Sequence, residues 1–234
     1  MVKTEKAIDW PPAGVKWYYS DKWVAIACGD CREILPQLDV KVDLVLTDPP
    51  YNAAGIGPNH RVYAGQIMKL PDIEYVEFCK QWFSLAQKIT ECIALTPGIA
   101  NLWLYPTPKW VLCWHKPSAI SYNRLGGFNA WEPILIYGKP KGRFGQDYIR
   151  QDPLNFTTGP EKKHPCPKPP KVWDWLINGM TSAGDTILDL FLGSGTTCYC
   201  AKKLNRHSIG IEIEEKYCEI AARRCSQEVF EFNV

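Results

Sequence analysis

Thr47-Asp48-Pro49-Pro50-Tyr51-Asn52 follows the mostly apolar run Val42-Asp43-Leu44-Val45-Leu46. The apolar run predicts a short buried strand, which would deliver Asp48 to its carboxyl end, where open α/β sheets bind their ligands. Two consecutive prolines fix φ and remove two N–H donors, so the carbonyls of Asp48 and Pro49 lack ladder partners on that side. The sequence therefore predicts a rigid corner that offers a carboxylate, carbonyl oxygens and an aromatic ring to an uncharged planar amine. The alternative is a proline-stiffened loop in which Asp48 is a turn residue.

Outward from this corner, strand and helix patterns alternate along the chain. The alternation predicts a mainly parallel sheet with helices on both faces, an α/β fold. The 234 residues, 46% of them hydrophobic, fit one core of that class. We therefore expect a single domain over residues 1–234, with insertions at about 52–71 and 116–171. The expected strands are 23–28, 42–46, 99–105, 110–115, one within 130–139, 186–191 and 208–213; the expected helices are 31–38, 72–92, 171–177, 196–204 and 214–227.

A second motif, Asp189-Leu190-Phe191-Leu192-Gly193-Ser194-Gly195-Thr196-Thr197, follows one of these strands. Its glycines predict a tight turn into a helix, where backbone N–H groups are open to a ligand. A phosphate-binding loop is the rival interpretation, but the third glycine of G-x-G-x-x-G and the lysine of a P-loop are missing. The motif suits a zwitterionic amino-acid tail, with the threonine hydroxyls on its carboxylate and Asp189 on its ammonium.

One further acidic residue lies where a ribose would be recognised, and another follows the first expected strand. Glu212 ends the next expected strand, 23 residues after Asp189, at the usual position of a ribose ligand. Its alternative role is that of a neighbour to a helix N-cap. Asp30 follows Gly29 after the first expected strand, and its side chain could cap the helix that begins at Cys31.

Together these motifs resemble the S-adenosylmethionine-dependent amino methyltransferases of DNA, over roughly residues 23–225. Because the Asp48 motif precedes the Asp189 motif, the order resembles the permuted β group of that family. The resemblance implies a Rossmann-like methyltransferase fold and methyl transfer from S-adenosylmethionine to the exocyclic N6 of adenine in DNA, with no metal. The target base would be flipped out of the duplex. Alternatives are N4 of cytosine, a base in RNA, a glutamine amide of a protein, or a catalytically silent binding relative.

The resemblance also implies roles for particular residues. Asp48 and the Pro49 carbonyl would bind the amine, and Tyr51 would stack on the base. His164-Pro165-Cys166-Pro167-Lys168-Pro169 resembles an element that walls the methionine end of the cofactor, whereas Trp131-Glu132-Pro133 with Lys139 resembles one that supports the base pocket, to which we assign a structural role only. The implied catalytic residues are Asp48, Pro49, Pro50 and Tyr51; the implied cofactor residues are Asp30, Asp48, His164, Lys168, Asp189, Phe191, Gly193, Ser194, Gly195, Thr196, Thr197, Glu212 and Ile213.

The overall charge does not by itself indicate a nucleic-acid-binding protein, because the formal net charge is only +2. Contact with the DNA substrate is instead expected from the glycine-containing loop 52–71 and from segment 116–171, which includes a basic stretch at 139–171. Both are alternatively ordinary solvated loops. Loop 52–71 directly follows the corner and could close over a substrate.

The ten cysteines do not predict a disulfide framework, because the chain is long and rich in core residues and no apolar signal segment follows Met1. We expect reduced thiols in a cytoplasmic protein, bacterial, archaeal or phage-encoded, within or outside a restriction-modification system. Cys28-x-x-Cys31 could be half of a zinc site or a redox pair, but no second pair or histidine spacing completes a metal site. No apolar run approaches the ~18 residues of a membrane span. A homodimer is expected by analogy alone.

Overall fold

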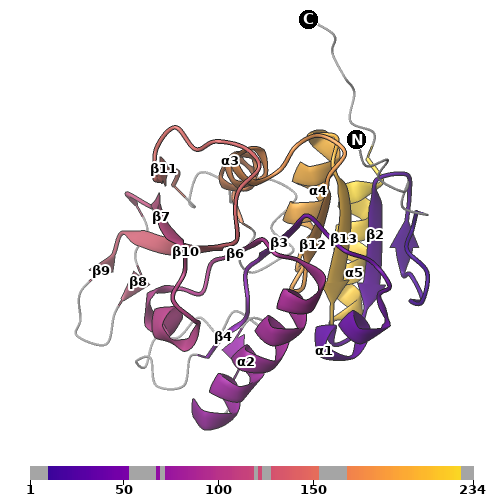
Figure 1. Ribbon diagram of the computed structural model, residues 1–234, viewed down its shortest axis with the longest axis horizontal. Coiled ribbons are helices and arrows are strands. Elements are labelled where there is room, and N and C mark those ends of the chain that lie inside the picture. Colours follow the sequence, from indigo (N-terminus) through magenta and orange to yellow (C-terminus); the bar gives the residue numbers. More distant parts are fainter. Residues whose placement is uncertain are drawn as a thin grey trace, which may run out of the picture.

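The structure, a computed structural model, describes residues 10–52, 67–68, 72–118, 121–122, 128–152 and 168–227. These residues form a nine-stranded sheet of order β1-β2-β13-β12-β3-β6-β10-β7-β11 (Figure 1). The five strands from β2 to β6 in this order run parallel to one another. Their bounds are Val24–Cys28 (β2), His207–Glu212 (β13), Thr186–Asp189 (β12), Leu44–Thr47 (β3) and Ile93–Leu95 (β6).

The remaining strands add antiparallel pairs at both ends of the sheet. β10 (Trp131–Tyr137) is antiparallel to β6 and to β7 (Trp110–His115), and β11 (Tyr148–Arg150) is parallel to β7. At the other edge, β1 (Tyr19–Ser20) is antiparallel to β2. Two small ribbons lie outside the sheet, β4 (Tyr51–Asn52) with β5 (Ile67–Met68) and β8 (Ser121–Tyr122) with β9 (Phe128–Asn129). The predicted α/β fold with a mainly parallel sheet is confirmed.

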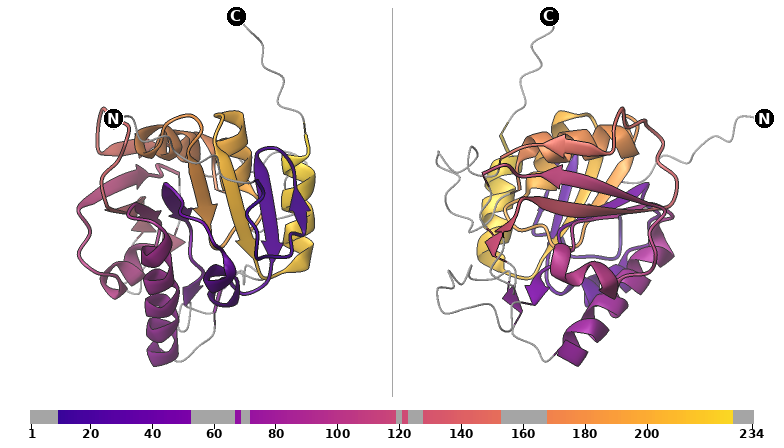
Figure 2. Two further views of the ribbon diagram at one scale, coloured as in Figure 1. Left: turned by 45° about the vertical axis from the view of Figure 1, so that its right-hand side comes forward. Right: turned by 90° about the vertical axis from the view of Figure 1, so that its left-hand side faces the viewer.

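Helices cover both faces of the sheet, as the two views of Figure 2 show. Side chains alternate along each strand, so Val45 packs on the face covered by α1 and α2, while Leu44 and Leu46 pack on the face covered by α3 and α4. α5 packs with α4 over β2. The helix bounds are Cys31–Ile34 (α1), Asp72–Ile89 (α2), Pro170–Met180 (α3), Thr196–Lys203 (α4) and Glu215–Cys225 (α5), with 3₁₀ turns at Leu35–Gln37 (η1) and Ile99–Leu104 (η2).

The predicted strand at 99–105 is wrong. This stretch is the 3₁₀ turn η2, which begins after Gly98 with a φ of 72°. Asn101 stabilises the turn, because its side-chain amide donates to the Pro97 carbonyl at 3.1 Å and its N–H donates to the Gly98 carbonyl at 3.3 Å. The strand that the sheet uses is the shorter run β6, Ile93–Leu95, which lies between the expected helix 72–92 and the expected strand 99–105. Of the loop 52–71, residues 53–66 and 69–71 lie outside the described part of the chain, and the expected domain division stays a prediction.

No helix in the described part of the chain combines the length and the apolar character needed to cross a membrane.

An aromatic cluster connects α2 to the strand ends that carry the motifs. Trp82 is fully buried, and its ring packs edge-on against Phe191 at 5.4 Å and against Phe83 at 5.7 Å between centroids. Phe191 belongs to the second motif, so this cluster links the core of the α2 face to the turn that precedes α4.

We predict that Trp82→Ala lowers the free energy of unfolding by about 3–5 kcal/mol, because it removes a large side chain from a closely packed site. The matched control is Trp103→Ala, whose side chain is 86% exposed and whose replacement should change stability by no more than about 0.5 kcal/mol. Urea denaturation of both variants measures the difference. Equal effects of the two substitutions would contradict the packing described here.

Candidate active site

The carboxyl ends of four parallel strands meet at one edge of the sheet. β3 ends at Thr47, so Asp48 lies at this edge as predicted. The pairing of Thr47 with Leu95 of β6, and the hydrogen bond from the Thr96 N–H to the Thr47 carbonyl at 3.2 Å, bring Thr96 beside Asp48. β12 and β13 end at the same edge, where Asp189 pairs with Gly210. The sheet therefore brings the two sequence motifs together.

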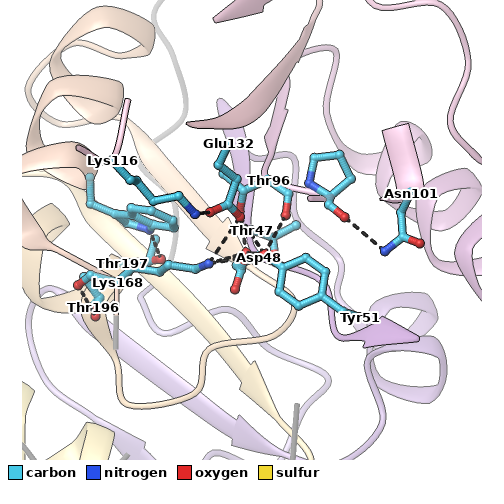
Figure 3. A network of polar contacts seen from close by, with 12 residues as sticks. Thr47, Asp48, Tyr51, Thr96, Asn101, Lys116, Glu132, Lys168, Thr196 and Thr197 are labelled. Carbon is cyan, nitrogen blue, oxygen red and sulfur yellow. Dashed lines mark hydrogen bonds and ion pairs between the residues drawn. The ribbon is translucent and has the colours of Figure 1, made fainter. Parts of the chain in front are cut away.

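Asp48 is held by three donors that converge on one of its oxygens (Figure 3). Its Oδ1 accepts from the Thr96 hydroxyl at 2.5 Å and from the Tyr51 hydroxyl at 2.6 Å, and it lies 2.8 Å from the Lys168 Nζ. The Asp48 side chain is only 9% exposed. Among the residues that the structure describes, none hydrogen-bonds to Oδ2.

Glu132 of β10 is a second buried carboxylate in the same site. Its Oε1 lies 2.7 Å from the Tyr51 hydroxyl oxygen and 3.6 Å from Lys168 Nζ, and its Oε2 pairs with Lys116 at 2.5 Å. Glu132 was expected to have a structural role only, and its contacts with Tyr51 and Lys168 beside Asp48 were not predicted. A usable signal was present, since an acid inside the apolar strand Trp131–Tyr137 needs charged or hydrogen-bonded partners.

The pKa values of these two carboxyls shift in opposite directions: that of Asp48 is raised and that of Glu132 is lowered. Burial raises the pKa of Asp48 and the neighbouring Glu132 adds to this, while Lys168 opposes it. Burial also acts to raise the pKa of Glu132, but the Lys168 and Lys116 ammonium groups outweigh it and hold that pKa at about 2. Glu132 is therefore the more firmly ionised partner of the two.

A cavity of about 190 Å³ opens next to Asp48 and is lined by residues from both motifs. Its lining combines carboxylates with apolar side chains that include Phe78, Leu190 and Tyr217. Asp48 and Gly193, separated by most of the chain, thus share one cavity. The sequence-predicted residues that line it are Asp30, Asp48, Pro50, Phe191, Gly193, Glu212 and Ile213.

Glu212 and Asp30 line this cavity and also make local hydrogen bonds. Glu212 accepts from the Gly193 N–H at 2.8 Å and from the Glu214 N–H at 2.9 Å, and burial raises its pKa. Asp30 caps α1 through the Arg32 N–H at 2.8 Å, and its side-chain pairing with Arg32 at 2.6 Å lowers its pKa. The capping role weighed for Asp30 is thus observed, and the cofactor roles of both acids stay predictions.

Asp189 and the threonines of the second motif do not line the cavity. Asp189 accepts from the Thr47 hydroxyl at 2.7 Å, from the Phe191 N–H at 3.1 Å and from the Thr197 hydroxyl. Thr197 also accepts from the Trp173 Nε1 at 2.7 Å, and Thr196 accepts from Arg224 at 3.0 Å. These hydroxyls are engaged within the protein, where they fix the turn and join it to α3 and α5.

The other implied residues lie in varied places. Gly195 has a φ of +83°, and an added Cβ would come within 2.8 Å of Ala221 Cβ, so this glycine lets α5 approach the turn. Ser194 and Pro49 are buried outside the cavity lining. The Lys168 ammonium lies 2.8 Å from Asp48, and its expected role at the cofactor stays a prediction; Lys139 is exposed. His164 lies outside the described residues.

The described part of the chain holds no group of three or more histidine, cysteine or acidic side chains placed to bind a metal ion. Its cysteines are free thiols, Cys28 and Cys31 among them.

Comparison with known proteins gives matches over most of the chain. A family model for N6- and N4-directed methyltransferases, described as DNA methylase, matches residues 107–223. The type II methyltransferase M.HpaI of Haemophilus parainfluenzae is 26% identical over 248 aligned residues, which cover 87% of this chain and 74% of that protein. M.HinfI of Haemophilus influenzae, also a type II methyltransferase, is 27% identical over 244 residues, which cover 84% of this chain and 66% of that protein.

Solved structures show the same fold. The PvuII DNA methyltransferase, described as cytosine-N4-specific, matches with a TM-score of 0.69 at 18% identity, over 94% of this chain and 91% of that one. The M1.HpyAVI complex with S-adenosylmethionine matches with a TM-score of 0.61 at 22% identity, over 87% of this chain and all of that one. At such identities the likeness concerns the fold alone.

Asp189 should make the stability of the protein depend on pH. Burial raises its pKa from 3.8 to about 6, so the folded protein binds this proton more tightly than the unfolded chain does. The resulting stabilisation is complete below about pH 4 and is lost as the pH rises through 6, on the order of 3 kcal/mol in all at about 1.36 kcal/mol per pKa unit.

We predict that Asp189→Asn removes this dependence, so that the variant gains stability relative to the wild type between pH 4 and pH 7. Denaturant unfolding at both pH values measures the change. Asp39→Asn, on an exposed side chain, is the control. A stability difference between Asp189→Asn and the wild type that stays constant with pH would rule out a buried, protonatable Asp189.

Proposed function

This chain belongs to the DNA methylase family of N6-adenine and N4-cytosine amino methyltransferases, and we propose that it transfers a methyl group from S-adenosylmethionine to N6 of an adenine flipped out of DNA. The observation that carries the proposal is the cavity shared by Asp48 and the turn at Gly193. Methyl transfer requires the sulfonium methyl group and the amine to meet in line, and a shared cavity at one sheet edge supplies that meeting place.

The cavity suits an adenosyl group by its chemistry. Phe191 and Ile213 offer apolar surface, and Ile213 is 64% exposed at the end of β13. Each oxygen of Glu212 already accepts one backbone N–H and retains a lone pair for a ribose hydroxyl. We assign the ribose to Glu212 and the adenine to the surroundings of Asp30 and Ile213. When bound, S-adenosylmethionine supplies an already activated methyl group, so the transfer itself needs no metal.

The catalytic corner acts on the amine by electrostatics and orientation. The lone pair of an exocyclic amine is delocalised into the base, and two acceptors on its N–H groups favour the pyramidal, more nucleophilic form. In our proposal Asp48 Oδ2 and the Pro49 carbonyl are these acceptors, and the carboxylate also stabilises the positive charge that develops on nitrogen. Tyr51, whose hydroxyl is bound to Asp48 and Glu132, presents its ring to the base.

Adenine is favoured over cytosine by the aspartate at position 48 in place of serine. N4 of cytosine is the second candidate, and the description of the PvuII enzyme as cytosine-N4-specific keeps it in view. The type II relatives further suggest a modification enzyme of a restriction-modification system acting in the cytoplasm. A homodimer is proposed by analogy, and analytical ultracentrifugation tests it.

Product analysis tests the proposed reaction. The purified protein is incubated with unmethylated DNA and S-adenosylmethionine, the DNA is digested to nucleosides, and the methylated base is identified by mass spectrometry. N6-methyladenine is expected. N4-methylcytosine would establish the second candidate. Methylation of RNA or of protein glutamine, with DNA left unmodified, would refute a DNA substrate.

We predict that Asp48→Ala lowers kcat at least about 100-fold, because it removes an acceptor aimed at the developing charge. Affinity for S-adenosylhomocysteine, measured by calorimetry, should be largely retained, since the apolar walls and Glu212 remain. Asp39→Ala, at an exposed aspartate on the α1 side of the molecule, should behave as the wild type. Substantial activity in Asp48→Ala would remove Asp48 from the mechanism.

A further inference from the structure

We propose that Glu132 is a positioning residue for methyl transfer: it holds Tyr51 and Lys168 against one oxygen of Asp48, so that the other oxygen faces the target amine. This inference rests on the proposed function and deepens it, because it extends the working site to a strand, β10, on the antiparallel side of the sheet. Glu132 itself need not touch the substrate, and it acts through its two neighbours.

The geometry around Asp48 supports this role. Thr96, Tyr51 and Lys168 place an oxygen or nitrogen 2.5, 2.6 and 2.8 Å from Oδ1, respectively. Such convergence fixes the rotation of the carboxylate and turns Oδ2 away from these donors. Two of the three, Tyr51 and Lys168, also contact Glu132 Oε1, at 2.7 and 3.6 Å. Glu132 thus contacts two of the three groups that hold Asp48, and Figure 3 shows these side chains gathered around Asp48.

The cluster of Tyr51, Asp48 and Glu132 requires Lys168 because it otherwise has too few protons for its acceptors. The Tyr51 hydroxyl lies within hydrogen-bond distance of a carboxylate oxygen on either side, yet it has only one proton to donate. Two ionised carboxylates and one hydroxyl would therefore repel one another. The Lys168 ammonium, 3.2 Å from the Tyr51 oxygen and close to both acids, supplies the missing donor. The arrangement works as a set rather than as separate pairs.

The charges balance within a buried site. Lys116 pairs with Glu132 Oε2, and Lys168 lies between Glu132 and Asp48, so two ammonium groups face two carboxylates. Because Glu132 is firmly ionised, the Lys168 ammonium interacts with both carboxylates and not with Asp48 alone. The negative charge of Asp48 is therefore less fully neutralised and acts more strongly on the amine. The titratable or charged groups that act on Asp48 are Tyr51 of β4, Tyr75 of α2, Glu132 of β10, Lys168 before α3, Asp189 of β12 and, through Glu132, Lys116 after β7.

If Glu132 had a purely structural role, its substitution would have a different effect on stability and kinetics. Loss of a buried anchor would lower stability and all kinetic parameters together, without a directed change in pH dependence. The positioning role forecasts opposite changes for the two charges. Removing the Glu132 charge lowers the pKa of Asp48, because a neighbouring anion is lost, whereas removing the Lys168 charge raises it.

The experiment measures kcat/KM for DNA methylation against pH in Glu132→Gln, Lys168→Met and the double variant. The acidic limb, which reports ionisation of Asp48 in the free enzyme, should move to lower pH in Glu132→Gln and to higher pH in Lys168→Met. In the double variant it should return toward the wild-type position. Both single variants should lose about 10-fold or more in kcat, because the corner loses its alignment.

Controls separate the outcomes. Glu219→Gln, at an exposed carboxylate paired with Arg223 on α5, should leave the profile unchanged. Binding of S-adenosylhomocysteine and the thermal midpoint establish that each variant is folded. An acidic limb that stays fixed, or moves the same way in both single variants, would overturn the role of Glu132 while wild-type methylation leaves the proposed function standing. Failure of the wild-type protein to methylate any DNA would overturn the function itself.

Discussion

The hydrogen bond from the Thr47 hydroxyl to the Asp189 carboxylate is the contact on which the site depends. It joins the last residue of β3 to the last residue of β12, so the two motifs, 142 positions apart, begin from a common point. Asp189 also orders the following turn through Phe191 and Thr197. A buried carboxylate with three donors is well satisfied, and its hydrogen bonds join the end of β3 to the turn that follows β12.

Around this hydrogen bond a largely apolar cavity adjoins a highly charged corner, and Asp48 belongs to both. The cavity has walls of aromatic and aliphatic side chains that continue into the Trp82 cluster. The corner concentrates two carboxylates and two lysines from segments that meet across β6 and β10. Each buried charge would be costly alone, and each is paired, so the corner stays polar and rigid beside an apolar pocket.

Several features of the fold follow directly from local patterns. The buried strand before Asp48, the turn at Gly193 and Glu212 at the end of β13 were all predicted, because period and glycine placement act within a few residues. The prediction failed at 99–105, where an apolar run forms a 3₁₀ turn. There the hydrogen bonds of Asn101 to Pro97 and Gly98 prevail over apolar composition.

The chain's order of residues was thus enough to establish the sheet class, the two motifs, their place at one sheet edge and the family they resemble. It did not reveal that Thr197 binds Asp189 and Thr196 binds Arg224 within the protein. Nor did it reveal that Lys168 pairs with Asp48, or that Glu132 contacts both Lys168 and Tyr51 beside it. Apart from the Thr197–Asp189 contact, these join segments far apart in the sequence, where a buried charge pairs with whichever partner the sheet order brings near. The tertiary structure therefore decided the partners of Asp48. The period of a strand can be recognised within a few residues of sequence, but the order of strands across a sheet cannot.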